Sequence, residues 1–251
     1  MLAAAERIVP DWPAPPRVHT WVTTRCGGVS EGRYASFNLA THCGDAPDRV
    51  AENRTRLVSI SGAPSICWLD QVHGVAVVDA GPNVTSPPTA DAALCRSSAR
   101  ACAILTADCL PVLICDRAGT LVAAAHCGWR GLAHGVLTNL VARLATRNDT
   151  LLAWLGPAIG PTHYEIGNDV RDALFDTVPA AIVDSAVRPG HGPGKWWADL
   201  YALARAELAG LGVTRVYGGG LCTYGDTRFY SFRRDGVTGR MATLIWLADG
   251  P

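Results

Sequence analysis

Two short apolar runs joined by a turn most strongly constrain how the middle of this chain can fold. The runs are Val112–Cys115 and Leu121–Ala125, and the segment Asp116–Thr120, which contains Gly119, separates them. Short runs rich in Val, Ile, Leu and Ala and bounded by turn residues are typical of buried strands. The pattern therefore predicts two neighbouring strands of a hairpin.

Residues able to bind a metal or an anion stand at the open end of this predicted hairpin. Cys109 comes just before the first strand, and His126 comes at the end of the second. The segment 128–131, with the sequence GWRG, then opens a predicted helix, whose N-terminal amides and dipole favour an anion. A thiolate, an imidazole and an anion-binding turn converge at one end of one supersecondary unit, which indicates a functional site.

The composition excludes some classes of partner. Of the 251 residues, 49% are hydrophobic and 18% are charged, and the formal net charge is zero. A neutral chain has no overall field to attract nucleic acid or an acidic membrane surface. We therefore expect small-molecule partners, and neither nucleic acid nor membrane. Both a monomer and a homodimer are compatible with the sequence.

Cysteine usage and the N-terminus bear on the compartment. The nine cysteines are scattered and include no CxxC pair, which argues against a disulfide framework. Glu6 and Arg7 interrupt the N-terminus before any long apolar core, so it does not resemble a signal peptide. No uncharged run of about 18 apolar residues could span a membrane. We therefore expect the protein in a reducing cytoplasm.

Predicted strands and helices follow one another without regular βαβ alternation. Residues 1–17 are rich in proline and predict a loose N-terminal arm, and residues 18–251 predict a single domain. The mixture predicts an α+β fold with mixed β-sheets flanked by helices. Besides the hairpin, the predicted strands are Val18–Thr23, Val75–Asp79, Cys102–Thr106, Leu151–Leu155, Val213–Tyr217 and Met241–Leu247. The predicted helices are Pro47–Ile60, capped near Asp45 or Asp48, an apolar stripe from Leu132 to Leu144, a helix capped by Asn168, and Asp199–Gly210.

Two histidines and one cysteine form a candidate metal site. His73, Cys109 and His126 each stand at a predicted strand end beside a polar or glycine-containing turn. Zinc accepts imidazole and thiolate ligands, and a catalytic zinc usually keeps three protein ligands and an open position. Because the three residues are far apart in the sequence, their spacing alone does not establish a site. The same residues permit a metal-free alternative, in which Cys109 is a nucleophile and His126 is its base.

Two common motifs for metal and nucleotide chemistry are incomplete or absent. His163-Tyr164-Glu165 matches the first half of the zinc deaminase signature, but no P-C-x-x-C follows. The sequence also has no HExxH, no GxGxxG and no GxxxxGK[ST]. These absences disfavour a zinc deaminase of that type, a zinc protease, a Rossmann dinucleotide site and a P-loop.

An ordered series of short motifs, spread over about residues 18–248, carries a clear family resemblance. Together they resemble the bacterial purine nucleoside phosphorylase family formerly called multicopper polyphenol oxidoreductase (laccase), whose members are also named peptidoglycan editing factors. The motifs are Thr24-Arg25-x-Gly27-Gly28-Val29-Ser30, Ser36-Phe37-Asn38-Leu39, His42-x-Gly44-Asp45, Gln71-Val72-His73-Gly74, Thr106-Ala107-Asp108-Cys109-Leu110-Pro111, His126-x-Gly128-Trp129-Arg130-Gly131, Gly156-Pro157-x-Ile159-Gly160 and Arg233-Arg234-Asp235-Gly236-x-Thr238-Gly239-Arg240.

The resemblance implies a zinc-dependent catalytic domain. It implies zinc ligation by His73, Cys109 and His126, with copper as a less favoured metal. It also implies phosphorolysis of adenosine, inosine and methylthioadenosine, with deamination of adenosine in addition. The fold that it implies resembles a deamidating toxin domain with a Cys–His pair. Two positions depart from the family pattern: Cys127 replaces a usual alanine, and His163 replaces a common cysteine.

Phosphorolysis requires cationic donors that hold phosphate against the sugar. With Cys109 and His126, Arg130 is predicted to be catalytic, as the first candidate phosphate anchor at the start of a helix. Arg25 and Arg233 are weaker candidates for the anion. The predicted substrate-binding residues are Arg25, Asn38, Asp91 and Arg233. The general acid could be Asp91, Asp108 or Glu165.

Three other functions use the same residues differently. A cysteine-type hydrolase editing a peptidoglycan precursor would use Cys109 as its nucleophile. A copper-dependent polyphenol oxidase would need several histidine-rich sites, and the seven histidines form no HxH cluster. A zinc-stabilised binding module would close the metal with a fourth ligand.

Overall fold

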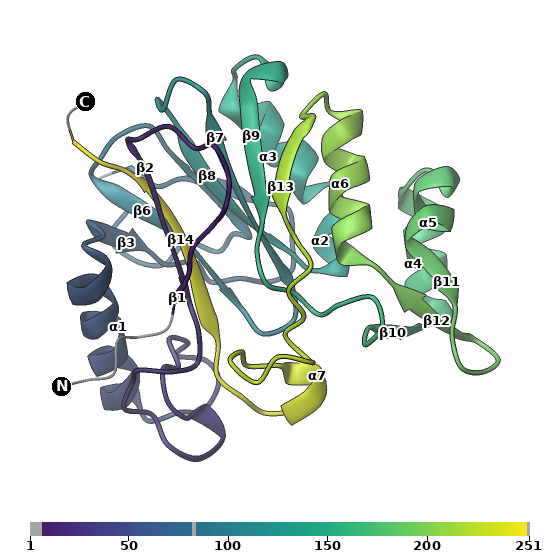
Figure 1. The fold of residues 1–251 in the computed structure, drawn as a ribbon, viewed down its shortest axis with the longest axis horizontal. Helices are drawn as coiled ribbons and strands as arrows, with labels where there is room; N and C mark the ends of the chain where they lie inside the picture. Colours follow the sequence, from purple (N-terminus) through teal and green to yellow (C-terminus); the bar gives the residue numbers. More distant parts are fainter. Residues whose placement is uncertain (1–6, 82–83, 250–251) are drawn as a thin grey trace.

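Two β-sheets pack face to face at the centre of the molecule, and the computed structural model describes residues 7–81 and 84–249 (Figure 1). The first sheet has five strands in the order β1 (Arg7–Ile8), β2 (Val18–Thr23), β14 (Met241–Leu247), β6 (Arg100–Thr106) and β3 (Ser65–Cys67). The second has six in the order β13 (Arg215–Gly218), β9 (Leu151–Leu155), β7 (Leu110–Asp116), β8 (Val122–Cys127), β5 (Ala92–Cys95) and β4 (Val77–Asp79). Both sheets contain parallel and antiparallel pairs, so the predicted α+β fold with mixed sheets is confirmed.

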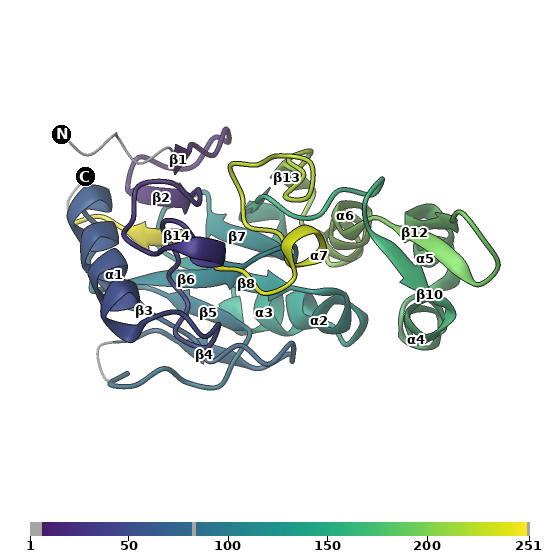
Figure 2. The ribbon, with the colours of Figure 1, turned by 90° about the horizontal axis from the view of Figure 1, so that it is seen from below.

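Helices cover the outer face of each sheet (Figure 2). Along β6, Cys102 and Ile104 face the second sheet, whereas Ala103 and Leu105 pack with Leu57 of α1 (Pro47–Ser61). The outer face of the second sheet packs against α2 (Trp129–Ala133), α3 (Val136–Leu144) and α6 (Leu200–Gly210). The layers therefore follow the order helix, sheet, sheet, helices, and alternate residues of a strand belong to different cores.

A smaller unit projects from one side of these layers (Figure 1). Its three-stranded sheet has the order β10 (Glu165–Gly167), β12 (Lys195–Ala198) and β11 (Val187–Pro189). The helices α4 (Asn168–Thr177) and α5 (Ala180–Ala186) pack beside it. The short elements are the turns of 3-10 helix η1 (Gly32–Tyr34) and η2 (Asn148–Thr150), and the helix α7 (Phe232–Asp235).

The predicted hairpin is present as the antiparallel pair β7 and β8. Every residue of both strands is buried, because the first sheet covers one face and helices cover the other. This explains why the two strands are continuously apolar rather than alternating. Pro111 lies opposite His126 in the register. Cys109, just before β7, is therefore brought to the same end of the sheet as His126.

Most other predicted elements are confirmed, with differences at their ends. The strands Leu151–Leu155 and Met241–Leu247 have their predicted bounds, and Asp199 caps α6 by accepting a hydrogen bond from the Ala202 amide. The apolar stripe from Leu132 to Leu144 is two helices, because Gly135 adopts a φ of 82° between α2 and α3. Gly135 can take this left-handed conformation at little steric cost.

Two predicted helix caps differ from the structure. Gly167, not Asn168, is the N-cap of α4, and the Asn168 side chain accepts a hydrogen bond from Trp196 Nε1 at 2.8 Å. Neither Asp45 nor Asp48 caps α1 with its side chain. The Asp45 carboxylate instead accepts hydrogen bonds from Ser30 and Asn38. In both cases a tertiary contact takes the side chain that the local pattern assigned to the cap.

The described part of the N-terminal arm is attached to the core rather than loose. Arg7–Ile8 pairs antiparallel with β2, and Trp12 and Ala14 pack against the core between the sheets. Residues 1–6 lie outside the described residues. The division of the chain at residue 17 stays a prediction.

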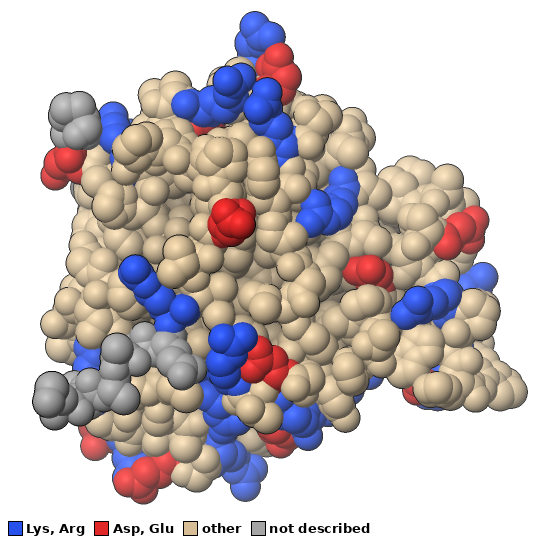
Figure 3. All heavy atoms as spheres, viewed as in Figure 1, with Lys and Arg blue, Asp and Glu red and all other residues tan. Residues whose placement is uncertain are grey.

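The surface shows no segregation of charge on the face drawn in Figure 3. Basic and acidic side chains are interspersed there, and most of this face is uncharged. Among the described residues, no helix combines the length and apolarity needed to cross a bilayer.

Candidate metal centre

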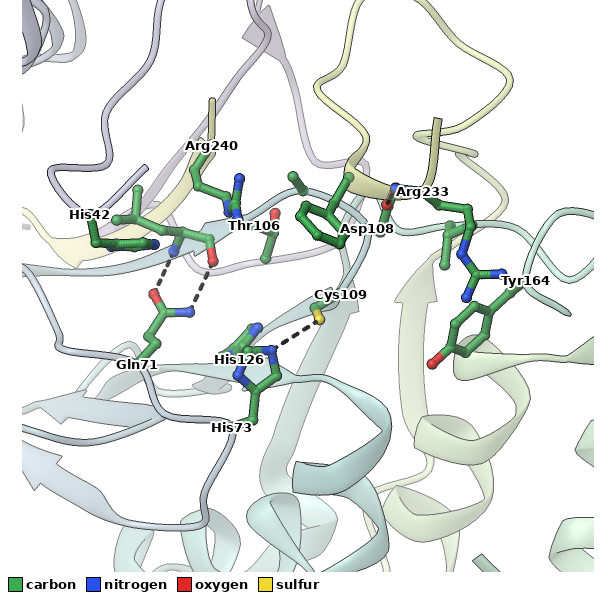
Figure 4. Close-up of a pocket in the computed structure, with 14 residues that line it drawn as sticks. His42, Gln71, His73, Thr106, Asp108, Cys109, His126, Tyr164, Arg233 and Arg240 are labelled. Carbon is green, nitrogen blue, oxygen red and sulfur yellow. Dashed lines mark hydrogen bonds between the residues drawn. The ribbon is translucent and has the colours of Figure 1, made fainter. Parts of the chain in front are cut away.

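Three potential ligands from three separate segments converge at one point (Figure 4). His73 lies in the turn before β4, Cys109 in the turn between β6 and β7, and His126 near the end of β8. One ligand atom from each lies within 4.8 Å of the others, and Cys109 Sγ is 3.8 Å from His73 Nε2. Zinc bonds of about 2.0–2.3 Å at tetrahedral angles separate ligand atoms by about 3.5 Å. The donor set and its spacing therefore fit a zinc ion after small side-chain movements.

The three residues lie on the wall of a cavity of about 310 Å³. Such a volume suits a small molecule of the size of a nucleoside or a cofactor fragment. Aromatic, cationic and polar side chains line it together. The lining residues are His42, Gln71, His73, Leu105, Thr106, Ala107, Asp108, Cys109, His126, Ile159, Tyr164, Phe232, Arg233 and Arg240.

A buried carboxylate orients His126. Asp91 is fully buried, and its Oδ1 lies 2.8 Å from His126 Nδ1. Because a carboxylate only accepts, Nδ1 carries the proton and donates it to Asp91, which leaves Nε2 available as a ligand. Burial opposes ionisation of Asp91, but hydrogen bonds from His126 and from the amides of Gly74 and Val72 lower its pKa. Asp91 thus stays a carboxylate and fixes the imidazole.

The same carboxylate fixes the backbone of the turn that carries His73. The amides of Val72, His73 and Gly74 donate to Asp91 at 3.2, 2.9 and 2.6 Å. Gln71 holds the turn from the other side, since its amide group forms hydrogen bonds of 2.9 and 2.8 Å with the carbonyl and amide of Leu105. These bonds maintain His73 at a φ of 60°, a conformation that is uncommon for residues other than glycine.

Gly128 leaves no room for a side chain beside the ligands. A Cβ atom at this position would lie 3.1 Å from Cys109 Sγ and 3.1 Å from His73 Cδ2. The φ of Gly128 is −70°, which any residue could adopt, so the close approach and not the backbone explains this glycine. Gly128 also caps α2, the helix that carries Arg130.

Electrostatics favour the ionised thiolate of Cys109. Burial raises the pKa of the thiol, but the positive charge of His126, hydrogen bonds from His126 and His73, and the charge of His73 together lower it to about 6. Burial lowers the pKa of His126, but the Cys109 thiolate and the Asp91 carboxylate raise it overall. Thiolate and imidazolium would therefore stabilise each other without a metal, and a bound cation would replace the proton on the imidazole.

The residues predicted to bind substrate are distributed unequally around the cavity. Arg233 lines it, and Arg130 is exposed outside the lining, with its guanidinium 4.5 Å from the Trp129 ring centre. Arg25 also lies outside the lining, donating to the Ala35 carbonyl at 2.9 Å. Direct contacts of Arg25 with the substrate therefore have no support in this arrangement.

Asn38 and Asp91 are fully buried and do not line the cavity. The Asn38 side chain bonds to the backbone of Ala40 and Arg240 and to Asp45, which fixes the loop around it. Asp91 supports the metal ligands as described above. Both side chains have their polar atoms bonded to other groups of the protein. Their contact with substrate stays a prediction.

Several lining residues were not among the site residues predicted from the sequence, including His42, Tyr164, Phe232 and Arg240. His42 and Arg240 occur within the ordered motifs, which was the available signal. Burial and the charges of Arg240 and Arg54 lower the pKa of His42, although Asp70 opposes them. Cations therefore surround His42 at one end of the cavity, and Arg233 with Tyr164 stands at the other end (Figure 4).

Comparison with known proteins gives a consistent result. Residues 19–248 match the family described as multi-copper polyphenol oxidoreductase laccase. The chain belongs to this family. It is 54% identical over 244 residues to purine nucleoside phosphorylase PA4543 of Pseudomonas aeruginosa, covering 96% of this chain and 98% of that protein. It is 50% identical to purine nucleoside phosphorylase YfiH of Escherichia coli, covering 96% and 98% of the two chains.

Solved structures of family members show the same fold. The crystal structure of Neisseria meningitidis protein NMB0706 matches with a TM-score of 0.92 and 51% identity, covering 97% of this chain and 99% of that chain. YlmD from Geobacillus stearothermophilus matches with a TM-score of 0.88 and 29% identity, covering 98% and 99%. The same overall fold is therefore present in these two proteins.

Replacing Asp91 with asparagine tests its role beneath the metal ligands. Asp91→Asn removes the charge that stabilises the His126 Nδ1 proton. It also places an NH2 group, which can only donate, where the carboxylate accepts hydrogen bonds from backbone amides. We expect zinc affinity to fall about 10- to 100-fold, the range typical of outer-shell partners of ligating histidines. Chelator competition measures the affinity, and thermal unfolding measures stability. Asp176→Asn, at an exposed position on α4, is the matched control and should leave both unchanged. Wild-type zinc affinity in Asp91→Asn would contradict the assignment.

Proposed function

We propose that this protein is a zinc-dependent purine nucleoside phosphorylase that acts on adenosine, inosine and methylthioadenosine and also deaminates adenosine. The observation that carries the proposal is the convergence of His73, Cys109 and His126 in a cavity that also contains two arginines and two aromatic side chains. Family members named purine nucleoside phosphorylase at 50–54% identity support it. Its substrates would be nucleosides and phosphate, without nucleic acid or membrane.

His73, Cys109 and His126 would hold the zinc ion. One thiolate and two imidazoles leave a fourth position open, which is the arrangement of catalytic rather than structural zinc. Zinc held in this way supplies a Lewis acid and lowers the pKa of a water to about 7. Asp91 keeps the His126 Nδ1 proton in place throughout, because its carboxylate is a permanent hydrogen-bond acceptor.

The arginines of the cavity would bind and orient phosphate. Arg233 and Arg240 line opposite ends, and guanidinium groups bind phosphate oxygens in pairs. Arg130 stays a candidate because it lies close enough to Tyr164 for its positive charge, like that of Arg233, to act against the rise in the pKa of the Tyr164 hydroxyl. The aromatic faces of Tyr164 and Phe232 would hold the flat purine, and the apolar lining excludes water from the sugar.

The compartment and assembly are further parts of this proposal. All nine cysteines are free, which supports a reducing cytoplasm. We propose a monomer or a homodimer.

A product assay with and without phosphate tests the function directly. Zinc-loaded protein incubated with inosine should release hypoxanthine and ribose 1-phosphate only when phosphate is present. Adenosine should additionally lose ammonia in the absence of phosphate. Cys109→Ala, which lacks the thiolate ligand, should lose stoichiometric zinc and both activities while keeping its circular dichroism spectrum. Absence of base release from all three nucleosides in phosphate would refute the proposal.

Substitution of single arginines by lysine tests which arginine binds the phosphate. Arg233→Lys and Arg240→Lys keep the charge and lose the paired donors, so we expect the phosphate KM to rise about tenfold or more, as for the loss of a charged hydrogen bond. Arg130→Lys should change it less, because Arg130 does not line the cavity. Steady-state kinetics at varied phosphate measure the effect, and zinc content should stay normal in all three. A phosphate KM that responds to Arg130→Lys alone would move the anchor there.

A cysteine-type hydrolase editing a peptidoglycan precursor is the second candidate function. The observation that favours it is the low pKa of Cys109, about 6, next to His126, which is typical of a nucleophile and base pair. The predicted resemblance of the fold to a deamidating toxin domain would accord with it. A copper-dependent polyphenol oxidase accords with the family name, but the described residues provide one three-residue metal group, whereas multicopper oxidation needs several.

Alkylation separates the metal site from thiol catalysis. Zinc should protect Cys109 from iodoacetamide at pH 7, and zinc removal should expose a thiolate that reacts rapidly, because its pKa is about 6. Cys26 is exposed and serves as the internal control that should react in both states. Mass spectrometry of tryptic peptides measures both. A covalent substrate adduct on Cys109, with activity retained after complete zinc removal, would favour the hydrolase.

A further inference from the structure

A buried carboxylate immediately precedes the ligand Cys109. Asp108 is 8% exposed, and both of its carboxylate oxygens accept short hydrogen bonds. Oδ1 accepts from the hydroxyl of Thr223 at 2.6 Å, and Oδ2 accepts from the backbone amide of Arg233 at 2.7 Å. One side chain thus connects the turn that carries Cys109 to the start of α7, which carries Arg233.

The conformation of this turn depends on those contacts. Asp108 has a φ of 97°, which few residues other than glycine adopt. The backbone alone would favour a negative φ, so the side-chain hydrogen bonds hold the turn in place. Because Cys109 follows directly, the direction of its sulfur depends on the same bonds. Figure 4 shows Asp108 between Cys109 and Arg233.

Thr223 is fixed independently of its hydroxyl. Its amide donates to the Ala158 carbonyl at 3.0 Å, and its carbonyl accepts from Arg234 Nη1 at 2.9 Å. Next to this contact, the Ile159 amide donates to the Asp108 carbonyl at 2.9 Å. Thr223 is fully buried and does not line the cavity. Its hydroxyl therefore reaches the site only through Asp108.

We propose that the hydrogen bonds of Asp108 to the Thr223 hydroxyl and to the Arg233 amide form a positioning clamp. This clamp fixes the position of the Cys109 ligand relative to the anion-binding residue Arg233 across the cavity. Thr223 is the positioning residue, and it acts through Asp108. With both oxygens bound to donors, Asp108 acts in this clamp as a hydrogen-bond acceptor. The inference rests on the proposed zinc site and phosphorylase activity, but zinc affinity measured without substrate tests it separately from that activity.

Substitution of Thr223 tests the clamp. Thr223→Val keeps the shape and the backbone contacts but leaves Asp108 Oδ1 without its donor. We expect zinc affinity, measured by chelator competition, to fall about tenfold, at the low end of the range for outer-shell partners. The phosphate KM should rise because Arg233 loses its fixed position. Thr223→Ser keeps the hydroxyl and should restore both values.

The matched control is Thr23→Val. Thr23 is also fully buried, and its hydroxyl accepts a hydrogen bond from the Ala242 amide at 2.9 Å, within the first sheet. Its loss should lower the unfolding temperature and leave zinc affinity and phosphate KM unchanged. Equal zinc affinity in Thr223→Val, Thr223→Ser and wild type would overturn the proposal, whatever the activity of the protein.

Substitution of Asp108 separates positioning from proton transfer. In Asp108→Asn, the amide oxygen can accept from Arg233 and the amide nitrogen can donate to the Thr223 oxygen, so the clamp remains while the charge is lost. We expect near-normal zinc affinity in Asp108→Asn, and reduced zinc affinity in Asp108→Ala. Loss of kcat in Asp108→Asn with zinc affinity retained would overturn the proposal in favour of Asp108 as the proton donor. Normal zinc affinity in Asp108→Ala would also overturn it.

Discussion

The hydrogen bond between His126 and the buried carboxylate of Asp91 is the interaction on which the rest of the site depends. A fully buried carboxylate is costly unless donors surround it, and Asp91 has one imidazole and three backbone amides. Those donors come from β8 and from the turn that carries His73. Formation of this buried network therefore brings two of the three ligands together as the protein folds. The third, Cys109, joins them through the antiparallel register of β7 and β8.

Unfavourable backbone conformations concentrate where the ligands lie. Among the described residues, three other than glycine have positive φ, and two of them, His73 and Asp108, line the cavity. Each is maintained by hydrogen bonds to a buried carboxylate, Asp91 in one case and Asp108 itself in the other. The fully buried strands β7 and β8 supply stability that offsets such strain. The double-sheet core and the strained turns above it are thus parts of one arrangement, which holds His73, Cys109 and His126 close together.

Charge in this protein is organised locally and not globally. The net charge is zero and one face is a mixture of both signs, yet Arg233 and Arg240 stand at opposite ends of the same cavity. Cationic donors in a partly enclosed cavity interact with an anion more strongly than the same groups in open water. This distribution accords with the proposed use of phosphate. Among the described residues, one group of two imidazoles and a thiolate could hold a metal ion, whereas a multicopper enzyme needs several centres.

The sequence by itself determined the parts of this protein that local patterns encode. Predominantly apolar runs marked β7, β8, β9 and β14, because strands that are buried on both faces carry few polar residues. The ordered motifs marked His73, Cys109 and His126, whose ligand atoms lie within 4.8 Å of one another in the structure.

Tertiary structure decided the rest. Asp91 and Asn38 were predicted to contact substrate, and the structure shows that their side chains point inward and bond to buried donors and acceptors. Thr223 contacts Asp108 because the loop that contains Thr223, more than a hundred residues further along the chain, packs beside it. Hydrogen bonds between distant segments have no periodicity along the chain, so no local pattern could have revealed them.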